Sequence, residues 1–479
     1  MGMEKKEKTV AEYLRKNPET FLKKRKRRWG ALKIMVLGFM GIILLGALIL
    51  MLPICNADGQ WLNFVDALFT SCTCVCVTGL VTVVPAVQFT FLGKLVLLAL
   101  IQIGGWGIIV CGMLFLLVLR RKISLNSRVL IHDYFSTDTV SGMVRMLIYV
   151  VKGTLIVESV GAVCLALHFI PEYGFLRGIW YGVFHAVSAF CNAGVDLLGD
   201  SSLAAYVGNP WINFVIMGLI ITGGLGFWVW KDITKFLKNL FIKREGLEKS
   251  LRGMALHTKI VITMTVSLIL AGVLFFAAAE WNNPETLGGL SSPEKAMAAL
   301  FQSVTTRTAG FFTISQSALR EASKFVSCVL MFVGGSPAST AGGMKTVTIA
   351  VVLLTCWSIL RGHEDTECYK RKIDISTVRM GIAVVTVGMM LVAAGTTALS
   401  LLEPHVDLID AMYEVVSAVG TVGLTADVTP HLGTVSKYII IFLMYVGRIG
   451  PITLPLLMAA KLGRKNDKRT LPREHIVVG

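Results

Sequence analysis

Long apolar runs alternate with shorter ones along most of the chain. Crossing a bilayer core as a helix takes about 20 residues. Eight runs qualify, near 31–52, 89–119, 146–170, 208–230, 258–279, 324–360, 380–402 and 434–460. Between the members of each pair lies a shorter run, near 62–76, 176–190, 294–306 and 407–419. At about 12–15 residues these runs are too short to span, so the pattern predicts four re-entrant helices.

Two glycine landmarks recur in the same order in four units. A glycine follows each short run, with separations of 115, 116 and 113 residues: Gly79, Gly194, Gly310 and Gly423. A second landmark follows 24 to 29 residues later and reads Gly104-Gly105-Trp106-Gly107, Gly223-Gly224-Leu225-Gly226, Gly334-Gly335-Ser336-Pro337 and Gly447-Arg448-Ile449-Gly450. Close helix packing explains one isolated glycine pair, but it explains poorly an order shared by four units.

The repeated unit predicts an all-α integral membrane protein. Each unit reads as span, re-entrant helix, glycine-bearing loop and span, and four linked copies can surround one axis. The predicted segments are a basic tail at 1–30, repeats at 31–120, 121–245, 246–362 and 363–463, and a second tail at 464–479. Because every repeat holds an even number of spans, all four share one orientation. That favours a pore over a carrier built from inverted repeats.

The loop glycines suggest how such a pore would select ions. In a carbonyl-lined filter, backbone oxygens replace the hydration shell of the ion. Irregular backbone at membrane depth is tolerated where it is buried in protein or lines a water-filled cavity, and glycine permits the positive φ that turns carbonyls inward. The four loops differ in side chains and carry at most one charge near the glycine. Selection by carbonyls therefore fits better than selection by a ring of carboxylates.

Composition and charge support a membrane location and give an orientation. Hydrophobic residues make up 54% of the 479 and charged residues 16%, against about 25% charged in a soluble domain. The net charge is +16, and five hydrophilic segments together carry +21: 1–33, 120–145, 231–259, 361–379 and 461–479. By the positive-inside rule these segments face the cytoplasm. We expect a multi-pass protein of the cytoplasmic membrane with both termini cytoplasmic, and no nucleic-acid partner, because the basic residues flank apolar spans.

The sequence lacks persuasive catalytic or metal-binding signatures. It contains no H-E-x-x-H, G-x-S-x-G or Walker A pattern. Cys72, Cys74 and Cys76 have no neighbouring histidine to complete a tetrahedral site. We therefore expect no enzymatic activity and no covalent cofactor. The alternatives are a membrane-embedded enzyme, an alternating-access carrier, and a sodium-permeable transporter of the same class.

Five strings carry a family resemblance: Cys76-Val77-Thr78-Gly79-Leu80, Phe190-Cys191-Asn192-Ala193-Gly194, Thr306-Arg307-Thr308-Ala309-Gly310-Phe311, Gly334-Gly335-Ser336-Pro337-Ala338-Ser339-Thr340-Ala341-Gly342-Gly343-Met344-Lys345-Thr346 and Gly447-Arg448-Ile449-Gly450-Pro451. Through them the chain resembles the Trk/Ktr/HKT superfamily of potassium transporters, and most of all KtrB, the membrane subunit of bacterial Ktr systems. The resemblance implies four M1–P–M2 repeats, with eight transmembrane helices and four re-entrant pore helices, around a pseudo-fourfold pore.

The resemblance also implies which residues form the potassium filter. They are Cys76, Val77, Thr78 and Gly79; Cys191, Asn192, Ala193 and Gly194; Arg307, Thr308, Ala309 and Gly310; and Gly420, Thr421, Val422 and Gly423. In the plant branch, serine at the first glycine position accompanies sodium transport, so Gly79 favours potassium. We expect Arg307 to point away from the axis and brace the loop from behind, because a cation facing the filter would repel potassium.

A break in the third unit predicts a gate. Segment 334–346 places glycines, serines and a proline between apolar runs, and that composition cannot form a continuous helix. The resemblance implies an intramembrane gate made by Gly334, Gly335, Ser336, Pro337, Ser339, Thr340, Gly342, Gly343, Lys345 and Arg448. A charge inside a span is costly, so we expect Arg448 to form an electrostatic barrier in the pore. The alternatives are a packed helix kink and, for Arg448, an ion pair with a buried carboxylate such as Glu158 or Glu414.

The resemblance further implies partners. Proteins of this kind are homodimers in the bilayer that sit on a cytosolic ring of RCK-type, KtrA-like nucleotide-binding subunits. No G-x-G-x-x-G motif opening a βαβ unit occurs in the sequence, so nucleotide sensing would come from that partner. Potassium is the expected substrate, and sodium dependence is left open.

Overall fold

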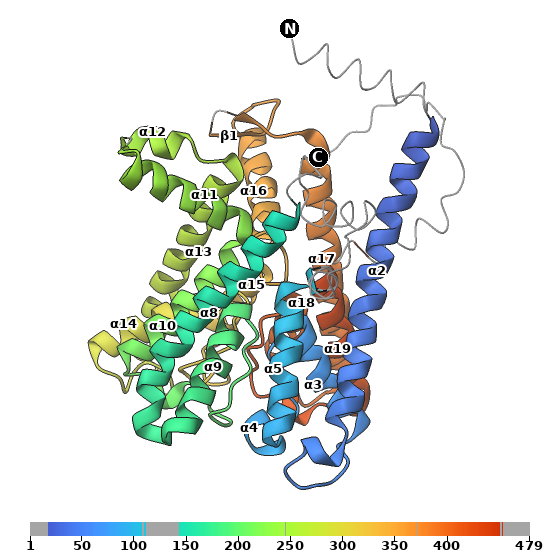
Figure 1. Cartoon of the computed structure of the whole chain (residues 1–479), viewed down its shortest axis with the longest axis vertical. Helices are drawn as coiled ribbons and strands as arrows, with labels where there is room; N and C mark the ends of the chain where they lie inside the picture. Colours follow the sequence, from blue (N-terminus) through green and yellow to red (C-terminus); the bar gives the residue numbers. More distant parts are fainter. Residues whose placement is uncertain are drawn as a thin grey trace.

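The computed structural model describes residues 18–107, 110–111, 143–244, 246–369, 371–450 and 453. This part of the chain is a bundle of helices (Figure 1). Its sheet is one antiparallel pair, β1 (Glu367–Cys368) and β2 (Arg371–Lys372). The predicted all-α class is confirmed. The predicted tail at 464–479 and most of the tail at 1–30 lie outside the described residues.

Four short helices form at the four short apolar runs. They are α3 (Phe64–Cys76), α9 (Phe175–Cys191), α14 (Ser292–Thr305) and α18 (Leu408–Gly420). Polar caps start two of them. The Asn63 side chain accepts a hydrogen bond from the N–H of Val65 (2.9 Å), and Ser291 and Glu294 form a capping box before α14. The residue after α3, α9 and α18 takes the left-handed conformation, which ends each helix.

A long helix packs against each short one. The long helices are α2 (Pro18–Leu50), α8 (Met143–Tyr173), α13 (Leu256–Glu280) and α17 (Ile375–Leu402). Within the described ranges, three helices have the length and apolarity of a membrane span: Arg145–Tyr173, Leu256–Glu280 and Ile375–Leu402. A fourth qualifies if a bent pair in the second unit counts as one span. α2 begins at Pro18, inside the segment that the sequence assigned to the tail.

The second long run of each unit breaks at its glycine landmark. The helices that precede the breaks are α5 (Phe91–Trp106), α10 (Pro210–Leu225), α15 (Glu321–Phe332) and α19 (Thr434–Ile449). The backbone φ is +80° at Gly107, +88° at Gly226 and +100° at Gly450. α11 (Phe227–Leu237) continues α10 only after a bend of 103°. Glycine permits a left-handed turn that leaves the helix direction, so the predicted span at 208–230 is bent at Gly226 instead of forming one straight helix. Most of the chain beyond the landmark in the predicted spans near 89–119 and 434–460 lies outside the described residues.

The third unit has the longest break. α15 and α16 (Thr346–Leu360) are separated by residues 333–345, which we call the break segment. Val333 and Met344, near its two ends, form a parallel bridge. The remaining described elements are η1 (Pro53–Cys55), α4 (Pro85–Gln88), η2 (Ala204–Tyr206), η3 (Lys238–Ile242), α12 (Leu247–Arg252) and η4 (Thr429–His431).

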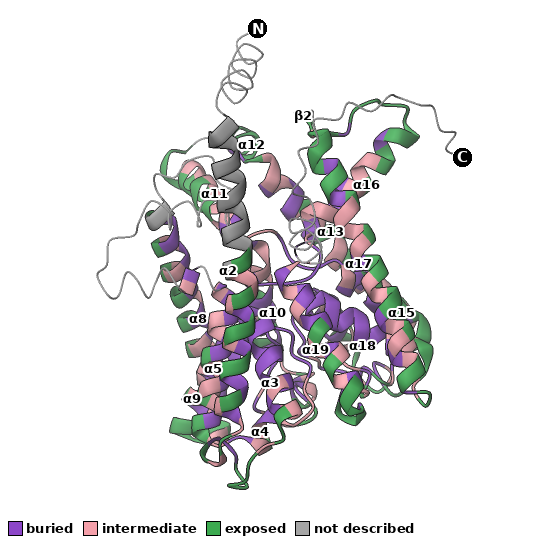
Figure 2. Cartoon of the chain, turned by 90° about the vertical axis from the view of Figure 1, so that its right-hand side faces the viewer, coloured by how far each residue is buried: buried purple, intermediate pink, exposed green. Residues whose placement is uncertain are grey.

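The units follow one another in a closed circuit. The second helix of each unit packs on the short helix of the next: α5 on α9, α10 on α14, α15 on α18, and α19 back on α3. The buried residues gather in the interior around α3, α10 and α18 (Figure 2). Outer helices expose large apolar side chains, with Leu274 exposed at 71% and Met390 at 64%. An apolar outer surface of this kind suits contact with lipid tails, which are as apolar as the exposed side chains.

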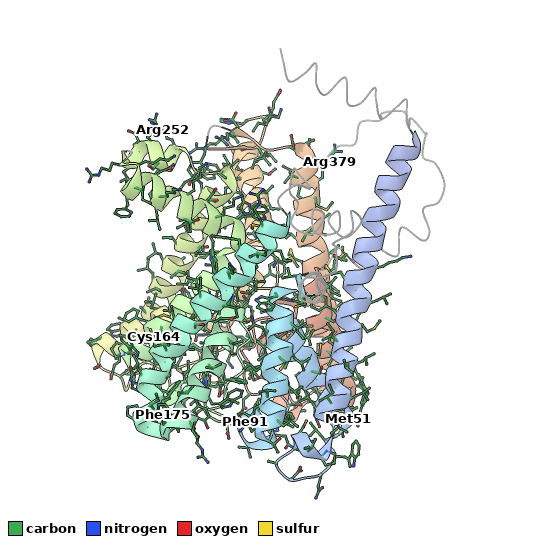
Figure 3. The ribbon with its side chains drawn as sticks, viewed as in Figure 1. Met51, Phe91, Cys164, Phe175, Arg252 and Arg379 are labelled. Atoms are coloured by element: carbon green, nitrogen blue, oxygen red, sulfur yellow. The ribbon has the colours of Figure 1, made fainter. Side chains whose placement is uncertain are left out.

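Residues labelled in Figure 3 mark the two ends of the bundle. Arg252 and Arg379 lie at one end, and Met51, Phe91 and Phe175 lie at the other (Figure 3). The first end is also where the chain leaves α16 for the basic stretch that follows it (Figure 1).

Candidate functional site

Four loops meet at the centre of the circuit of helices. We call residues 76–79, 191–194, 307–310 and 420–423 the ring loops. An ideal Cβ built on any of the four loop glycines would lie too close to a carbonyl oxygen of the next loop. The distances are 2.7 Å from Gly79 to Ala193 O, 2.7 Å from Gly194 to Ala309 O, 2.6 Å from Gly310 to Val422 O, and 2.2 Å from Gly423 to Thr78 O. Each glycine thus faces the carbonyl oxygen just before the glycine of the next loop, and the fourth loop returns to the first. Real Cβ atoms essentially never come within 3.0 Å of such neighbours, so a side chain at these positions would push the loops apart.

Each ring loop repeats one backbone conformation. All four glycines have positive φ, and so does the residue two positions earlier, at 56° for Val77, 60° for Asn192, 70° for Thr308 and 49° for Thr421. Three of these residues are β-branched, for which the left-handed region is strained. Such strain persists where the surrounding structure over-determines it, and it clusters at functional sites.

Hydrogen bonds from the helix ends enforce this conformation. In the first loop, the N–H of Val77 donates to Cys74 O (3.2 Å) and the N–H of Thr78 donates to Thr73 O (2.8 Å). The second and fourth loops make the same pair of bonds at 2.8–3.1 Å. This is the Schellman arrangement that satisfies the last carbonyls of a helix. The third loop differs, because α14 ends at Thr305, five positions before Gly310, whereas the other three short helices end three positions before their glycine.

A hydroxyl from each short helix supports its ring loop. Thr73 Oγ1 accepts a hydrogen bond from the N–H of Gly79 (2.9 Å). Ser417 Oγ accepts one from the N–H of Gly423 (3.0 Å). In the other two loops the hydroxyl donates to the carbonyl after the glycine, from Ser188 to Val195 O and from Thr305 to Phe311 O. These four residues are not among those predicted from the sequence, although a Ser or Thr stands five or six positions before each ring glycine.

Buried polar groups support the chain just beyond the ring loops. Glu414 is fully buried and accepts hydrogen bonds from the Thr425 hydroxyl, the Ala426 N–H (2.9 Å) and the Thr429 hydroxyl. Glu158 accepts a hydrogen bond from Gln102 Nε2 (3.1 Å), and Cys191 Sγ lies 3.8 Å away. Both carboxylates thus accept hydrogen bonds from uncharged donors that pack around the ring loops.

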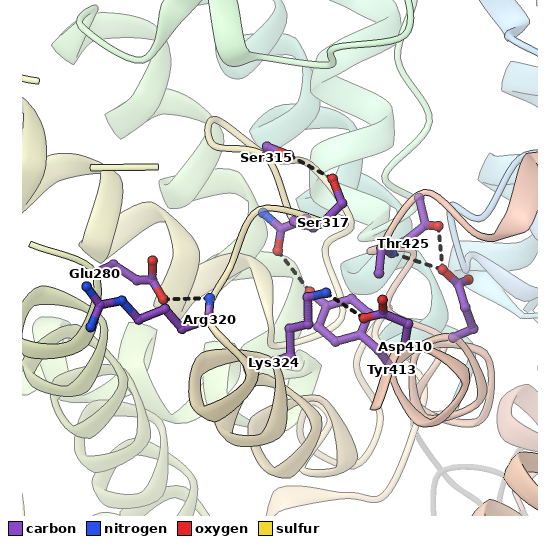
Figure 4. A network of polar contacts seen from close by, with 11 residues as sticks. Glu280, Ser315, Ser317, Arg320, Lys324, Asp410, Tyr413 and Thr425 are labelled. Carbon is purple, nitrogen blue, oxygen red and sulfur yellow. Dashed lines mark hydrogen bonds and ion pairs between the residues drawn. The ribbon is translucent and has the colours of Figure 1, made fainter. Parts of the chain in front are cut away.

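Two ion pairs join neighbouring units. Lys324 of α15 pairs with Asp410 of α18 (Nζ–Oδ1 2.6 Å; Figure 4). Lys437 of α19 pairs with Asp66 of α3 (2.8 Å). Both lysines stand ten positions before the first glycine of the second landmark, and both aspartates stand 13 positions before the ring glycine. The pairs therefore occupy equivalent joins, from the third unit to the fourth and from the fourth back to the first.

The break segment packs against the bend between α10 and α11. The N–H of Ser336 donates to Gly224 O (3.0 Å), and the N–H of Phe227 donates to Ala338 O (2.9 Å). The Thr340 hydroxyl donates to Phe190 O (2.9 Å), next to the second ring loop. These bonds satisfy backbone groups that the two interrupted helices leave unpaired.

The break segment also touches the fourth ring loop. A Cβ built on Gly343 would lie 2.7 Å from Gly420 O, and one built on Gly342 would lie 2.0 Å from the Thr421 hydroxyl. Only a residue without a side chain fits at either position without displacing the ring loop. The segment is therefore in backbone contact with the ring.

Two basic side chains of the predicted gate hold this segment. Arg448 Nη1 donates to Thr340 O (2.6 Å) and Nη2 donates to Gly104 O, so Arg448 bridges the break segment and the landmark of the first unit. Lys345 Nζ donates to Ala341 O (2.7 Å) within the segment. The structure thus brings together the predicted gate residues of two distant parts of the sequence.

Arg307 opens the third ring loop and is almost fully buried. It is 8% exposed and borders a narrow cavity with Ile220, Thr265 and Gly335. Its Nε has no hydrogen-bond partner in the described part of the chain.

The described residues contain no group of three or more His, Cys, Asp or Glu placed to hold a metal ion. Cys72 and Cys76, whose sulfur atoms are 3.7 Å apart, are buried in α3 and free of disulfides. They act as small apolar residues in the packing.

The fold and the ring loops define a class, an all-α membrane protein whose units converge on a strained central ring. A family model described as TrkH, cation transport protein, matches residues 14–468. The chain therefore belongs to this family of cation transport proteins, which are membrane ion transporters and not enzymes.

Relatives of similar length support the assignment. The potassium/sodium uptake protein NtpJ of Enterococcus hirae is 36% identical over 464 residues, covering 96% of this chain and all of the relative. The Ktr system potassium uptake protein B of Bacillus subtilis is 37% identical over 421 residues, 88% of this chain and 91% of that protein. The crystal structure of the potassium transporter TrkH from Vibrio parahaemolyticus has the same fold, with a TM-score of 0.69 at 19% identity over 90% of this chain and 85% of that one.

Proposed function

We propose that this chain takes up potassium across the cytoplasmic membrane through the centre of the four ring loops. The observation that carries the proposal is the closed circuit in which each ring glycine faces a carbonyl oxygen of the next loop. Carbonyls in such a ring can replace the hydration shell of a cation. The short helices end at the loops, so their negative dipole ends favour a cation there. Relatives named as potassium uptake proteins support the choice of ion.

The test compares potassium and sodium uptake in proteoliposomes for wild type and Gly79→Ser. The added side chain enters a position where an ideal Cβ is 2.7 Å from Ala193 O, so we expect potassium selectivity to fall. Gly59→Ser is the matched control, because Gly59 also has positive φ (+66°) but has no neighbouring atom within 4 Å. Unchanged selectivity in folded Gly79→Ser protein would overturn the assignment of the ring loops.

A sodium-permeable transporter is the second candidate. The name of the Enterococcus hirae relative includes sodium. The same proteoliposomes separate the two candidates, because a sodium-permeable protein would pass sodium in the wild-type form at a rate comparable to potassium.

The break segment and Arg448 are proposed as the gate. The segment contacts the fourth ring loop, and Arg448 ties it to the first unit through Thr340 O and Gly104 O. A cation leaving the ring would meet this positive charge. Deleting residues 336–343 should raise flux, and Arg448→Ala should raise the initial uptake rate. Unaltered kinetics in a folded Arg448→Ala protein would remove the barrier role and favour a purely structural one.

The orientation and partners are also proposals. The exposed basic residues Arg252 and Arg379 lie at one end of the bundle (Figure 3), which supports a cytoplasmic location for that end. The excess of Lys and Arg in 1–33 and 461–479 supports the same location for both termini. We further propose the four-repeat division at the boundaries given above, a homodimer, and control by a cytosolic RCK-type subunit. Co-purification with such a subunit, lost on removal of the cytoplasmic segments, would test the last point.

A further inference from the structure

A cavity of about 700 Å³ opens between α13, α16 and the β1–β2 hairpin, away from the ring loops. Its apolar walls include Ile260 and Met264 on α13, and Leu353, Leu354 and Trp357 on α16. A cavity of this volume lies in the range that holds a small organic ligand. Nothing in the proposed ion path uses it.

A basic and aromatic rim closes the walls at one end. Arg361 lines the cavity, and its guanidinium carbon lies 4.8 Å from the centre of the Trp357 ring. Lys259 Nζ lies 6.0 Å from the centre of the Tyr369 ring. No carboxylate in the described part of the chain forms an ion pair with Arg361. One acidic residue, Glu367, also lines the cavity.

The hairpin that roofs the cavity is held in place. The N–H of His363 donates to Ser358 O (2.9 Å), which turns the chain back over the end of α16. Tyr369 takes a left-handed conformation (φ +50°), and its hydroxyl lies 2.7 Å from Thr263 Oγ1 on α13. Because a strained residue persists only where contacts over-determine it, these bonds indicate a built cavity between two helices.

The walls and the rim face different surroundings. Leu353 and Trp357 are 57% and 55% exposed and lie on an apolar helix that leads away from the break segment. Arg361 follows that helix and opens the basic stretch 361–379. Trp and Tyr favour the boundary between hydrocarbon and headgroups, and basic pockets between helices on the cytoplasmic side suit anionic headgroups. A ligand here would have an apolar part at membrane depth and an anionic part at the surface.

We propose that this cavity binds one anionic phospholipid of the cytoplasmic leaflet. The phosphate contacts Arg361 and lies near Lys259, while an acyl chain lies along Leu353, Leu354 and Met264. The negative charge of Glu367 disfavours binding of a small free anion. A lipid also buries its acyl chain against the apolar walls, which stabilises its binding. The inference rests on the proposed membrane orientation. It is independent of the ion that the protein carries.

Native mass spectrometry of the full chain in detergent tests the site. The protein is titrated with phosphatidylglycerol or with phosphatidylcholine of the same acyl chains. In wild type we expect tighter binding of phosphatidylglycerol. Arg361→Gln should weaken it roughly fivefold, the factor one basic residue near an anionic lipid contributes. Leu354→Trp should displace both lipids by filling the cavity.

Arg379→Gln is the matched control, because Arg379 is exposed at the same end of the bundle and lies outside the cavity lining. It should change binding by less than about twofold, as expected for an isolated surface charge. Equal affinity for the two lipids, or equal weakening by both arginine variants, would overturn the proposal.

Two other occupants give different outcomes. Loss of dimers in Leu354→Trp with full lipid retention would identify the cavity as a contact between copies of this chain, and the proposal would be wrong. Competition by water-soluble glycerol phosphate as strong as that by the lipid would point to a free phosphate ester, and would also overturn it. No ion flux enters these measurements, so failure of the proposed transport function would leave them interpretable.

Discussion

The ion pair between Lys437 and Asp66 joins the last unit to the first, and neutralising one partner should weaken the ring. The two atoms are 2.8 Å apart, and the side chains are 16% and 18% exposed. At an effective dielectric constant of about 20, the gross attraction is roughly 6 kcal/mol, from which desolvation takes a large share. Lys437→Met leaves Asp66 in a mostly buried place without its cation. We expect a loss of about 3 kcal/mol, the lower end for a broken buried pair, because some solvent still reaches both groups.

The charge-swapped double variant Lys437→Asp with Asp66→Lys should recover most of that loss. Recovery should fall short by about 0.3–1 kcal/mol, because Asp66 stands in the first turn of α3, where a lysine opposes the helix dipole. Unfolding of purified protein in a denaturing-detergent titration is measured for wild type, Lys437→Asp, Asp66→Lys and the double variant, which are the four corners of the cycle, and uptake assays follow the same samples.

Lys94 provides an internal control. It too stands ten positions before its landmark, but its Nζ donates to Ala86 O (2.6 Å) instead of to a carboxylate. Lys94→Met should therefore cost only about 1 kcal/mol, the net value of one hydrogen bond. A coupling energy between Lys437 and Asp66 below about 0.5 kcal/mol, the scatter for independent sites, would refute the reasoning.

Three further predictions address local contacts. Gly423→Ala should destabilise by at least about 1–3 kcal/mol through overpacking, because its Cβ would lie 2.2 Å from Thr78 O. Gly218→Ala, in α10 with nothing within 4 Å, should stabilise by up to about 1 kcal/mol; thermal unfolding of both variants checks this, and equal midpoints would contradict it. Glu414→Ala should cost about 3 kcal/mol or more, because three buried donors lose their acceptor, and a detergent unfolding curve like that of wild type would contradict this. The hydrogen bond from Ser436, the largest cause, lowers the pKa of Glu403 below its ordinary value of 4.5. The Glu403 carboxylate therefore stabilises the fold above pH 4.5 and loses this effect as pH falls through its lowered pKa. Glu403→Gln should lower the unfolding midpoint at pH 7, and the midpoints of variant and wild type should converge in acid. A difference between the two midpoints that stays constant with pH would contradict the linkage.

The apolar pattern predicted the four short helices almost to their ends because a run of that length between two spans has few alternatives. The glycine spacing likewise located the ring loops. Both are local signals: one is the number of consecutive apolar residues, and the other is a position where glycine adopts positive φ without strain. The same local reading failed at Gly226, where it extended a span through a 103° bend. Hydropathy alone does not distinguish a continuous apolar helix from one that turns at a glycine.

The sequence by itself determined the membrane class, the order of elements, the repeated landmarks and the break in the third unit, since each depends on composition or spacing along the chain. Only the tertiary structure decided which groups meet. It placed Arg448 against Thr340 O and Gly104 O, and it gave Glu414 three neutral donors where the sequence left an arginine open as a partner. It also closed the circuit from Gly423 to Thr78. The reason is physical: these contacts join residues up to several hundred positions apart, and their partners are set by how four similar units pack around one axis.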